Sequence, residues 1–422
     1  MAAEVTLEQL QGMAKEVYAD SFEDLIPEHV YLLKMIPFKE SEKLGFAYNE
    51  PVVVSESQGV TYGGPEDDAM TLNPPIATST RNARVRGSQI VARDQIGYKA
   101  AASLVAKGPK AFVNGTEHVI RQLLKTSTRR LELMLLYGGS GLGVAASSAN
   151  QAATKTRITI QTKQWGPGIW VGMKNAQLDA IDNTDAVINT TGPLTVDKVD
   201  MANRKLDLTG AAADIAALDT EIAANPNTVR LFFLGAFEKE ALGLDKIITT
   251  SGTLFEIDNT VYDLFQGNQF DAGGAALSFT KLSKAAGQLV PFGVEGDLLV
   301  MVSPATWENL NNDEAGSRRY DSSYKSRLAE KGVEAIDYHY QMGVMSVMSH
   351  PCVKEGEAFM VKKSALKRVG AQEISMKNPG SGDRIFFDRP ENSSFEIRTY
   401  CDQAIFSDHP SWLLKIINIV NS

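Results

Sequence analysis

Histidine and cysteine are the residue types from which this chain could most readily build a metal or catalytic centre. The five histidines are spread over the whole length, at His29, His118, His339, His350 and His409. None stands in an HExxH motif, and neither cysteine stands at zinc-ligand spacing from a histidine. We therefore interpret each histidine as structural, and we predict no metal site.

Motifs for a nucleophile or for phosphate binding are missing as well. The sequence contains no GxSxG elbow, no Walker lysine and no dinucleotide fingerprint after a predicted strand. Residues 139–143 read Gly-Ser-Gly-Leu-Gly, but they follow a predicted helix and carry no Lys-Ser or Lys-Thr pair. The pattern indicates a flexible turn within a Gly/Ser/Ala loop over residues 138–150.

Charged clusters are the last candidates for chemistry. A basic group surrounds Ser364 and comprises Lys362, Lys363, Lys367 and Arg368. It could contact an anion, although a solvated face is the simpler interpretation. Paired carboxylates occur in two predicted loops, at Asp67-Asp68 and at Asp313-Glu314. Without a cleft that raises one pKa, such pairs are ordinary surface acids. The lack of a coherent catalytic group favours a structural role, so we predict no enzymatic activity and no cofactor.

Composition narrows the class further. A chain of 422 residues, 43% hydrophobic and 22% charged, can hold two or three globular domains. The 42 basic residues against 51 acidic ones give a net charge of −9, which argues against a surface that grips nucleic acid or anionic membrane. It remains compatible with a protein that merely encloses nucleic acid. Cys352 and Cys401 indicate free thiols in a reducing cytoplasm. No apolar run approaches a membrane span, and the polar start of the chain does not resemble a signal peptide.

Residues 110–137 predict one long helix. We expect the other predicted elements to be arranged around it. Apolar side chains recur at three- and four-residue steps, at Phe112, Val113, Ile120, Leu123, Leu124, Leu131, Met134 and Leu135. Pro109 suits a first turn, and Gly138-Gly139 ends the run. At the usual rise per residue the helix would be about 40 Å long, enough to span a domain.

Before this helix, the apolar period changes to two and predicts a long two-stranded ribbon. Phe46, Tyr48, Val52 and Val54 lead out, and Ala83, Val85, Gln89 and Val91 lead back. Two arms of about fifteen residues would reach about 50 Å. Such a ribbon is marginal alone in water, so it must be covered by its own fold or by a neighbour.

The distribution of charge on the ribbon favours the second possibility, that a neighbouring subunit covers it. Acidic residues gather on the outgoing arm and tip, at Glu56, Glu66, Asp67 and Asp68, whereas arginines gather on the return arm, at Arg81, Arg84, Arg86 and Arg93. Patches of opposite sign on one projecting element suit head-to-tail contact between identical subunits. We predict these eight residues as inter-subunit contacts, with a solvated internal hairpin as the alternative.

After the long helix, the sequence first predicts mainly strands and then a mixture of helices and strands. Strands are predicted at residues 157–162 and 169–173. Short strand-like runs over 182–210 indicate a small β-rich insertion, and a short helix at 211–224 follows it. The later predicted elements are a helix at 279–289, strands at 297–302, 334–340, 342–348 and 358–362, a long alternating strand at 395–406 and a closing strand at 412–420. A polar loop is expected at 311–326.

Five short segments, read in order, carry a family resemblance. They are Gly-Leu-Asp at 243–245, Thr-Leu-Phe-Glu-Ile-Asp at 253–258, Val-Ser-Pro-Ala-Thr-Trp at 302–307, Arg-Arg-Tyr-Asp at 318–321, and the ending Asp-Gln-Ala-Ile-Phe at 402–406 through Pro410. Together with the order of the predicted elements, they resemble the major capsid protein of tailed bacteriophages, which has the Hong Kong 97 fold. The resemblance covers nearly the whole chain, and its specificity comes from the order of the segments.

The resemblance implies an α+β fold and a division of the chain. Its parts would be an N-terminal arm (1–45), an extended β-hairpin loop or E-loop (46–105), the spine helix with the peripheral domain (106–181), the β-rich insertion (182–237), a peripheral/axial connection (238–276), the axial domain (277–384), and a long peripheral return strand with a closing axial strand (385–422).

The function implied is that of a shell protein. Copies of the chain would form homo-hexamers and homo-pentamers of an icosahedral capsid that encloses double-stranded phage DNA without sequence-specific binding. The expected partners are the chain itself, a separate scaffolding protein, a portal and, as an option, a decoration protein. The protein would be made in the host bacterial cytoplasm and reside in the virion, without a membrane. Two alternatives stay open: an encapsulin-type cargo compartment, and an α/β enzyme of unknown class.

Overall fold

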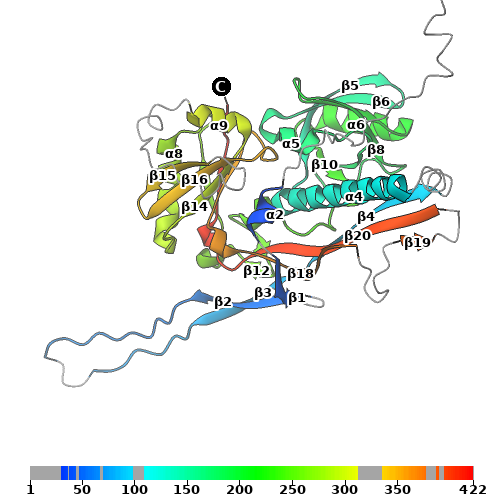
Figure 1. Ribbon diagram of the computed structural model, residues 1–422. Helices are drawn as coiled ribbons and strands as arrows, with labels where there is room; N and C mark the ends of the chain where they lie inside the picture. Colours follow the sequence, from blue (N-terminus) through cyan, green and yellow to red (C-terminus); the bar gives the residue numbers. More distant parts are fainter. Residues whose placement is uncertain are drawn as a thin grey trace, which may run out of the picture.

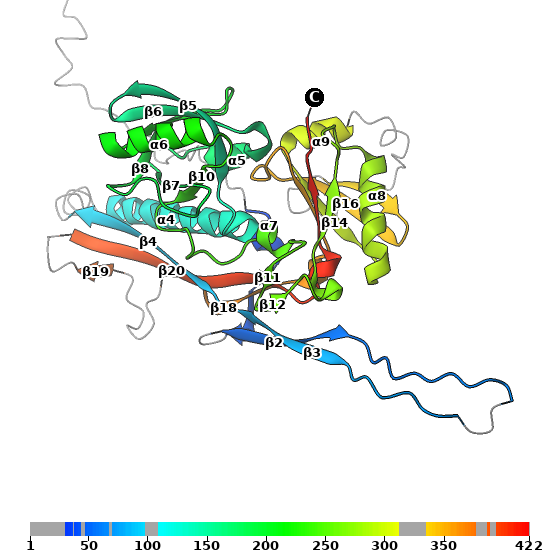
Figure 2. The same ribbon diagram turned by 180° about the vertical axis from the view of Figure 1, so that it is seen from behind.

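The computed structural model describes residues 30–36, 38–43, 47–66, 70–97, 109–311, 335–376, 386–388 and 394–421. A helix of 29 residues, α4 (Pro109–Tyr137), crosses the middle of the body. A long sheet lies along one side of α4 and a β-barrel along the other, while a second sheet stands at the end of the helix (Figures 1 and 2). The short helix α2 (Leu32–Met35) rests against α4.

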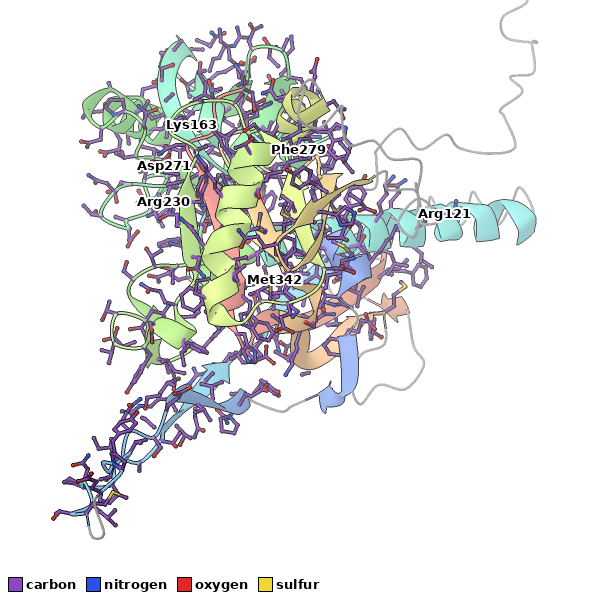
Figure 3. The ribbon with its side chains drawn as sticks, turned by 90° about the vertical axis from the view of Figure 1, so that its left-hand side faces the viewer. Arg121, Lys163, Arg230, Asp271, Phe279 and Met342 are labelled. Carbon is purple, nitrogen blue, oxygen red and sulfur yellow. The ribbon has the colours of Figure 1, made fainter. Side chains whose placement is uncertain are left out.

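The predicted long helix is confirmed, and its C-terminal end is the most deeply buried part. Every side chain from Leu133 to Tyr137 is at most 3% exposed. A helix that is buried all round must be surrounded by other elements, unlike one that shows a single apolar stripe. Gly138 follows its last residue, and glycine is needed there because a Cβ would overlap the carbonyl oxygen of Ala241. Figure 3 shows Arg121 on the part of α4 that extends beyond the body.

The long sheet beside α4 carries the chain's longest strand. Among the described residues the sheet contains five strands: β1 (Phe38–Lys43), β18 (Leu366–Ser375), β20 (Ser394–Ser407), β19 (Phe386–Asp388) and β4 (Ser88–Gly97). Strand β20 has 14 residues and confirms the predicted long alternating strand. It pairs antiparallel with β4 from Ser394↔Gly97 to Gln403↔Ser88. Thr399 Oγ1 lies 2.6 Å from Ser127 Oγ on α4, which couples the sheet to the helix.

The barrel on the other side of α4 closes upon itself. Its strands are β5 (Gly143–Ala152), β6 (Lys155–Ile160), β7 (Gln177–Ile181), β8 (Leu194–Asp200), β9 (Lys205–Thr209) and β10 (Arg230–Phe233), in the spatial order β10-β5-β6-β9-β8-β7. Helix α6 (Ala212–Ala224), predicted at 211–224, packs against it with Ile215, Leu218 and Ile222 buried.

Two predictions in this region are wrong. Residues 143–150, predicted as loop, belong to β5, because the small residues Gly143 and Ala145 fit the crowded barrel wall that the rest of the fold supplies. Residues 169–173, predicted as a strand, instead overlap the short helix α5 (Pro167–Trp170), which Pro167 starts at its first turn. The buried Ile169 and Trp170 account for the apolar pattern without a strand.

The stretch predicted as an insertion is β-rich but is not a unit of its own. Strands β8, β9 and β10 complete a barrel that β5, β6 and β7 begin. The predicted boundary between residues 181 and 182 therefore falls inside one closed sheet, because the barrel needs strands from both sides of it.

The second sheet has six strands among the described residues. They are β13 (Asn268–Asp271), β21 (Leu414–Ile417), β17 (Ala358–Val361), β14 (Leu298–Val302), β16 (Gly343–Ser349) and β15 (Ala335–Tyr340), in that spatial order. Helix α8 (Phe279–Leu289) covers one face, where Phe279 stacks on Tyr338 at 5.0 Å between ring centroids. Helix α9 (Pro304–Asn311) follows β14. Residues 312–326 of the predicted polar loop lie outside the described residues.

Short elements join the two sheets. They are α7 (Leu244–Ile247), the paired strands β11 (Thr253–Leu254) and β12 (Ile257–Asp258), and the 3-10 turn η2 (Asp263–Phe265). No helix in the described part of the chain is long and apolar enough to cross a membrane.

Candidate assembly surface

A hairpin leaves the body and ends far from it (Figure 1). Its strands β2 (Tyr48–Ser55) and β3 (Ser79–Val85) pair antiparallel from Tyr48↔Val85 to Ser55↔Ser79. The paired arms have eight and seven residues, which corrects the prediction of about fifteen residues each. Gln89 and Val91, predicted on the return arm, belong to β4 and pair with β20 instead.

Gly87 is the point at which the returning chain changes partner. A Cβ at this position would overlap Asp402 Oδ1 on β20, so glycine leaves room for the Asp402 carboxylate where the two strands approach each other. The chain can then pass from the hairpin directly into the long sheet. Movement of the hairpin base is thereby tied to the strand that packs on α4.

The outer part of the hairpin exposes apolar side chains. Between 50% and 90% of their surface is accessible at Val53, Val60, Tyr62, Met70, Leu72 and Ile76. The two branches are held together by bonds such as Gln58 N–H to Ile76 O at 3.2 Å and Asn73 N–H to Thr61 Oγ1 at 2.8 Å. A long, thinly paired hairpin with an apolar surface is marginal alone in water, and exposed apolar patches mark interaction sites.

The base of the hairpin is fastened by the turn between β11 and β12. The backbone N–H of Arg84 donates to Phe255 O at 2.9 Å, and Arg84 Nη1 lies 3.7 Å from a Glu256 carboxylate oxygen. Arg81 Nε donates to Tyr262 Oη at 3.0 Å. Ala83 and Val85 are buried. The hairpin therefore projects from a firm base.

That turn is itself strained. Phe255 and Glu256 have φ angles of 50° and 70°, in the left-handed region that favours glycine. Positive φ at both central residues is the conformation of a type I′ turn, one of the two favoured turns for a two-residue hairpin such as that between β11 and β12. Packing stabilises it, because the Phe255 ring lies 5.2 Å from the Phe406 ring and is 7% exposed. The strain places the Phe255 carbonyl where Arg84 can bind it.

The structure separates the residues predicted as contacts into groups. Glu56 and Glu66 are exposed on the outgoing branch and tip, and Arg86 is exposed at the end of the return branch. Arg93 lies away from the hairpin, on β4 opposite Arg398. Arg81 and Arg84 contact their own chain at the hairpin base, as described above, and Asp67 and Asp68 lie outside the described residues.

Sequence reasoning missed two features of this surface. The exposed apolar residues, such as Tyr62 at 90% and Leu72 at 73%, stand in a Gly/Pro-rich stretch, where their type could have been noticed. The anchor at Phe255, Glu256 and Tyr262 lies more than 150 residues away along the chain from Arg81 and Arg84. Only the segment 253–258 signalled it, as part of the family resemblance.

The body also contains a buried ionic cluster at the end of α4. Lys415 forms ion pairs with Asp245 and, at 3.0 Å, with Glu357. Lys354 Nζ donates to Gly141 O at 3.0 Å and lies 4.2 Å from the centre of the Tyr137 ring. Burial lowers the pKa of Lys354 and raises that of Tyr137 well above its ordinary value. The cluster ties the six-stranded sheet and α7 to the end of the helix.

Nothing in this cluster converges on an open site for chemistry. Lys354 and Glu357 are buried, and the ammonium group of Lys354 donates to the backbone oxygen of Gly141 and the amide oxygen of Gln164. Across the described ranges, no group of three histidine, cysteine or acidic side chains is arranged to hold a metal ion. Among the described elements, the hairpin projects from the body and exposes apolar side chains.

The described fold is similar to that of solved phage and GTA capsid structures, which agrees with the family resemblance in the sequence. The capsid protein of cyanophage A-1(L) superposes with a TM-score of 0.54 at 12% identity, over 98% of this chain and 98% of that one. The capsid of a native GTA particle gives a TM-score of 0.50 at 7% identity, over 99% of this chain and 100% of that one. No protein-family model matches the sequence. No curated protein matches it either.

Proposed function

We propose that this chain is a major capsid protein of a tailed bacteriophage. Many copies assemble into hexamers and pentamers of an icosahedral shell, and that shell encloses double-stranded DNA. The work of the protein is association, so no residue is assigned a catalytic role. The chain is made in the host cytoplasm and ends in the virion.

One observation carries the proposal: the hairpin exposes apolar side chains that its own chain does not cover. Tyr62 and Leu72 are 90% and 73% exposed at the far end of an element that is fixed at its base. Burying such a hairpin on a neighbouring copy would remove well over about 1,000 Å² of surface per contact, the size of lasting interfaces. The likeness to capsid proteins in fold supports the same conclusion.

The parts of the Hong Kong 97 fold map onto the described elements in a simple way. We assign α4 as the spine helix, the hairpin from β2 to β3 as the E-loop, and β4, β18 and β20 as the sheet of the peripheral domain. The six-stranded sheet with α8 and α9 would be the axial domain. The barrel would be an elaboration of the peripheral domain that starts at β5, earlier in the chain than the predicted insertion.

The net charge of the chain supports a role as a shell that encloses DNA. A net charge of −9 disfavours tight binding of DNA, which a shell must hold and later release. Opposite charges on the hairpin, with Glu66 at the tip and Arg86 near the base, suit contacts between identical subunits arranged head to tail. Scaffolding, portal and decoration proteins would be separate chains.

The decisive experiment expresses the full chain alone and images the product by negative-stain electron microscopy beside a sedimentation profile. Closed thin-walled particles, or rings of five and six subunits, are expected. A uniform monomer that stays monomeric when a scaffolding protein from the same gene neighbourhood is co-expressed would refute the proposal. In closed particles, the contents separate a phage capsid from an encapsulin-type compartment, because the latter would carry a protein cargo.

A further inference from the structure

Residues 30–36 are held against the body by a carboxylate that is completely buried. Glu132 on α4 has 0% side-chain exposure. Its Oε1 accepts hydrogen bonds from Tyr31 N–H at 3.0 Å and Leu32 N–H at 2.6 Å, and its Oε2 accepts one from Leu33 N–H at 2.8 Å. A buried carboxylate is tolerated when hydrogen-bond donors compensate its charge, and here the backbone of a distant segment supplies three of them.

His350 supplies a further donor and orients the carboxylate. Its Nδ1 accepts a hydrogen bond from Cys352 N–H at 3.1 Å, which places the ring proton on Nε2. Nε2 lies 3.0 Å from Glu132 Oε1 and can donate to it. The ring is fully buried, and the Tyr31 ring meets it edge-on at 5.0 Å. His350 is thus a positioning residue for Glu132.

The opposite end of the segment is held by a charge of opposite sign. Arg368 on β18 donates from Nε to Ile36 O, at the C-terminal end of α2. Its other nitrogens bind Gln403 at 2.9 Å and Glu373 at 3.0 Å. The donor end of α2 therefore meets a carboxylate and the acceptor end meets a guanidinium.

Within the segment, the two ends are linked by α2 itself. Met35 N–H donates to Tyr31 O at 3.1 Å and Ile36 N–H donates to Leu32 O at 3.0 Å. A single helical turn is unstable alone, because nucleation costs more than one or two hydrogen bonds return. If the body releases either end of residues 30–36, the single helical turn is expected to unfold.

We propose that residues 30–36 form a latch that closes on the Glu132 carboxylate and opens as one unit. His350 holds the carboxylate in place, and Arg368 holds the far end. When the latch opens, the segment becomes available for contacts outside its own chain. The inference concerns the single subunit and does not depend on shell assembly.

The test is amide hydrogen exchange on the full chain, measured residue by residue. In Glu132→Gln, the side-chain amide places its own N–H donors where the carboxylate accepted hydrogen bonds from the backbone N–H groups of residues 31–33. The five amides of Tyr31, Leu32, Leu33, Met35 and Ile36 are expected to exchange about 100-fold faster, all to the same extent. Arg368→Met releases the other end and is expected to speed the same five amides. It also tests the idea if the first variant does not fold.

A matched control lies one turn away on the same helix. Arg129 is buried like Glu132, but its Nη2 binds the carbonyl oxygens of Gly168 at 2.9 Å and Ile169 at 3.2 Å. Arg129→Met is expected to leave the amides of residues 31–36 unchanged. His350→Gln retains a donor toward Glu132 and should exchange nearly as slowly as the wild type, whereas His350→Leu should exchange faster.

Three results would overturn the latch. Faster exchange confined to Tyr31, Leu32 and Leu33, with Met35 and Ile36 still protected, would show that the segment does not open as a unit. Unchanged exchange in both Glu132→Gln and Arg368→Met would show that neither charge holds it. Equal acceleration of the α4 amides around Leu135 would show that the carboxylate supports the core in general.

Discussion

Removal of the apolar side chains near the hairpin tip should raise the concentration needed for assembly without destabilising the subunit. Leu72 and Ile76 are 73% and 56% exposed. Full burial of such a side chain contributes about 1.5–3 kcal/mol, so covering the exposed part of each contributes about 1–2 kcal/mol. The double change Leu72→Ser and Ile76→Ser should therefore weaken each hairpin contact by about 3 kcal/mol.

In an assembly assay this loss is large, because every subunit makes the contact. A tenfold change in an equilibrium constant corresponds to about 1.4 kcal/mol, so the concentration needed for assembly should rise about 100-fold or more. Light scattering against protein concentration measures this threshold. The free energy of unfolding of the unassembled subunit should change by less than about 0.5 kcal/mol, because exposed side chains contribute little to it.

A matched control uses apolar residues that are exposed elsewhere. Val187 and Leu234 lie on and next to the barrel and are 42% and 48% exposed. Val187→Ser with Leu234→Ser should leave the threshold close to that of the wild type. The reasoning is refuted if the hairpin variant assembles at the wild-type concentration, or if the control variant is impaired just as strongly.

Two further predictions concern the subunit itself. Gly138→Ala should lower the free energy of unfolding by about 1–3 kcal/mol, since its Cβ would overlap the backbone oxygens of Ala241 and Met134; denaturant unfolding measures this, and an unchanged midpoint contradicts the close contact. Burial raises the pKa of Glu240 from 4.5 to about 7, against the lowering effects of the Gly139 N–H and Arg130. Its stabilisation is complete below pH 4.5 and is lost as the pH rises through about 7, by at most about 3 kcal/mol. Glu240→Gln should abolish this part of the pH dependence of unfolding, and a variant with the wild-type pH profile would exclude Glu240 as its source.

Regular elements with a strong apolar period were predictable from the sequence. The helix α4 and the strand β20 match their predicted ranges closely, because each buries one side chain after another at the spacing of its own secondary structure. The predicted helix at 279–289 forms as α8, where Ser278 accepts a hydrogen bond from Lys281 N–H as its N-terminal cap. Local propensity and tertiary packing agree in these segments.

Prediction was wrong where small residues or short apolar runs depend on partners far away in the chain. Strand β5 begins at Gly143 and continues through Ala145 and Ser147, residues that by themselves indicate a loop. They form a strand because β6 and β10 offer hydrogen bonds on either side. In the same way, β4 is not part of the hairpin, because it pairs with β20 along its whole length.

The candidate assembly surface was also predictable from the sequence only in part. The projecting hairpin could be recognised from alternation, which is a local property of the sequence. The sequence could not indicate that Arg81 and Arg84 are engaged by Tyr262 and Glu256, because such contacts depend on how distant segments fold together.

By itself, the sequence therefore determined the long helix, the presence of the hairpin and the long strand β20, since each of these follows from periodicity along one stretch of chain. The tertiary structure alone decided that the stretch from β5 to β10 closes into a barrel, that β4 joins β20, and that Glu132 holds residues 31–33 from about 100 positions away. The physical reason is that strand pairing and buried hydrogen bonds are made between segments that no local pattern connects.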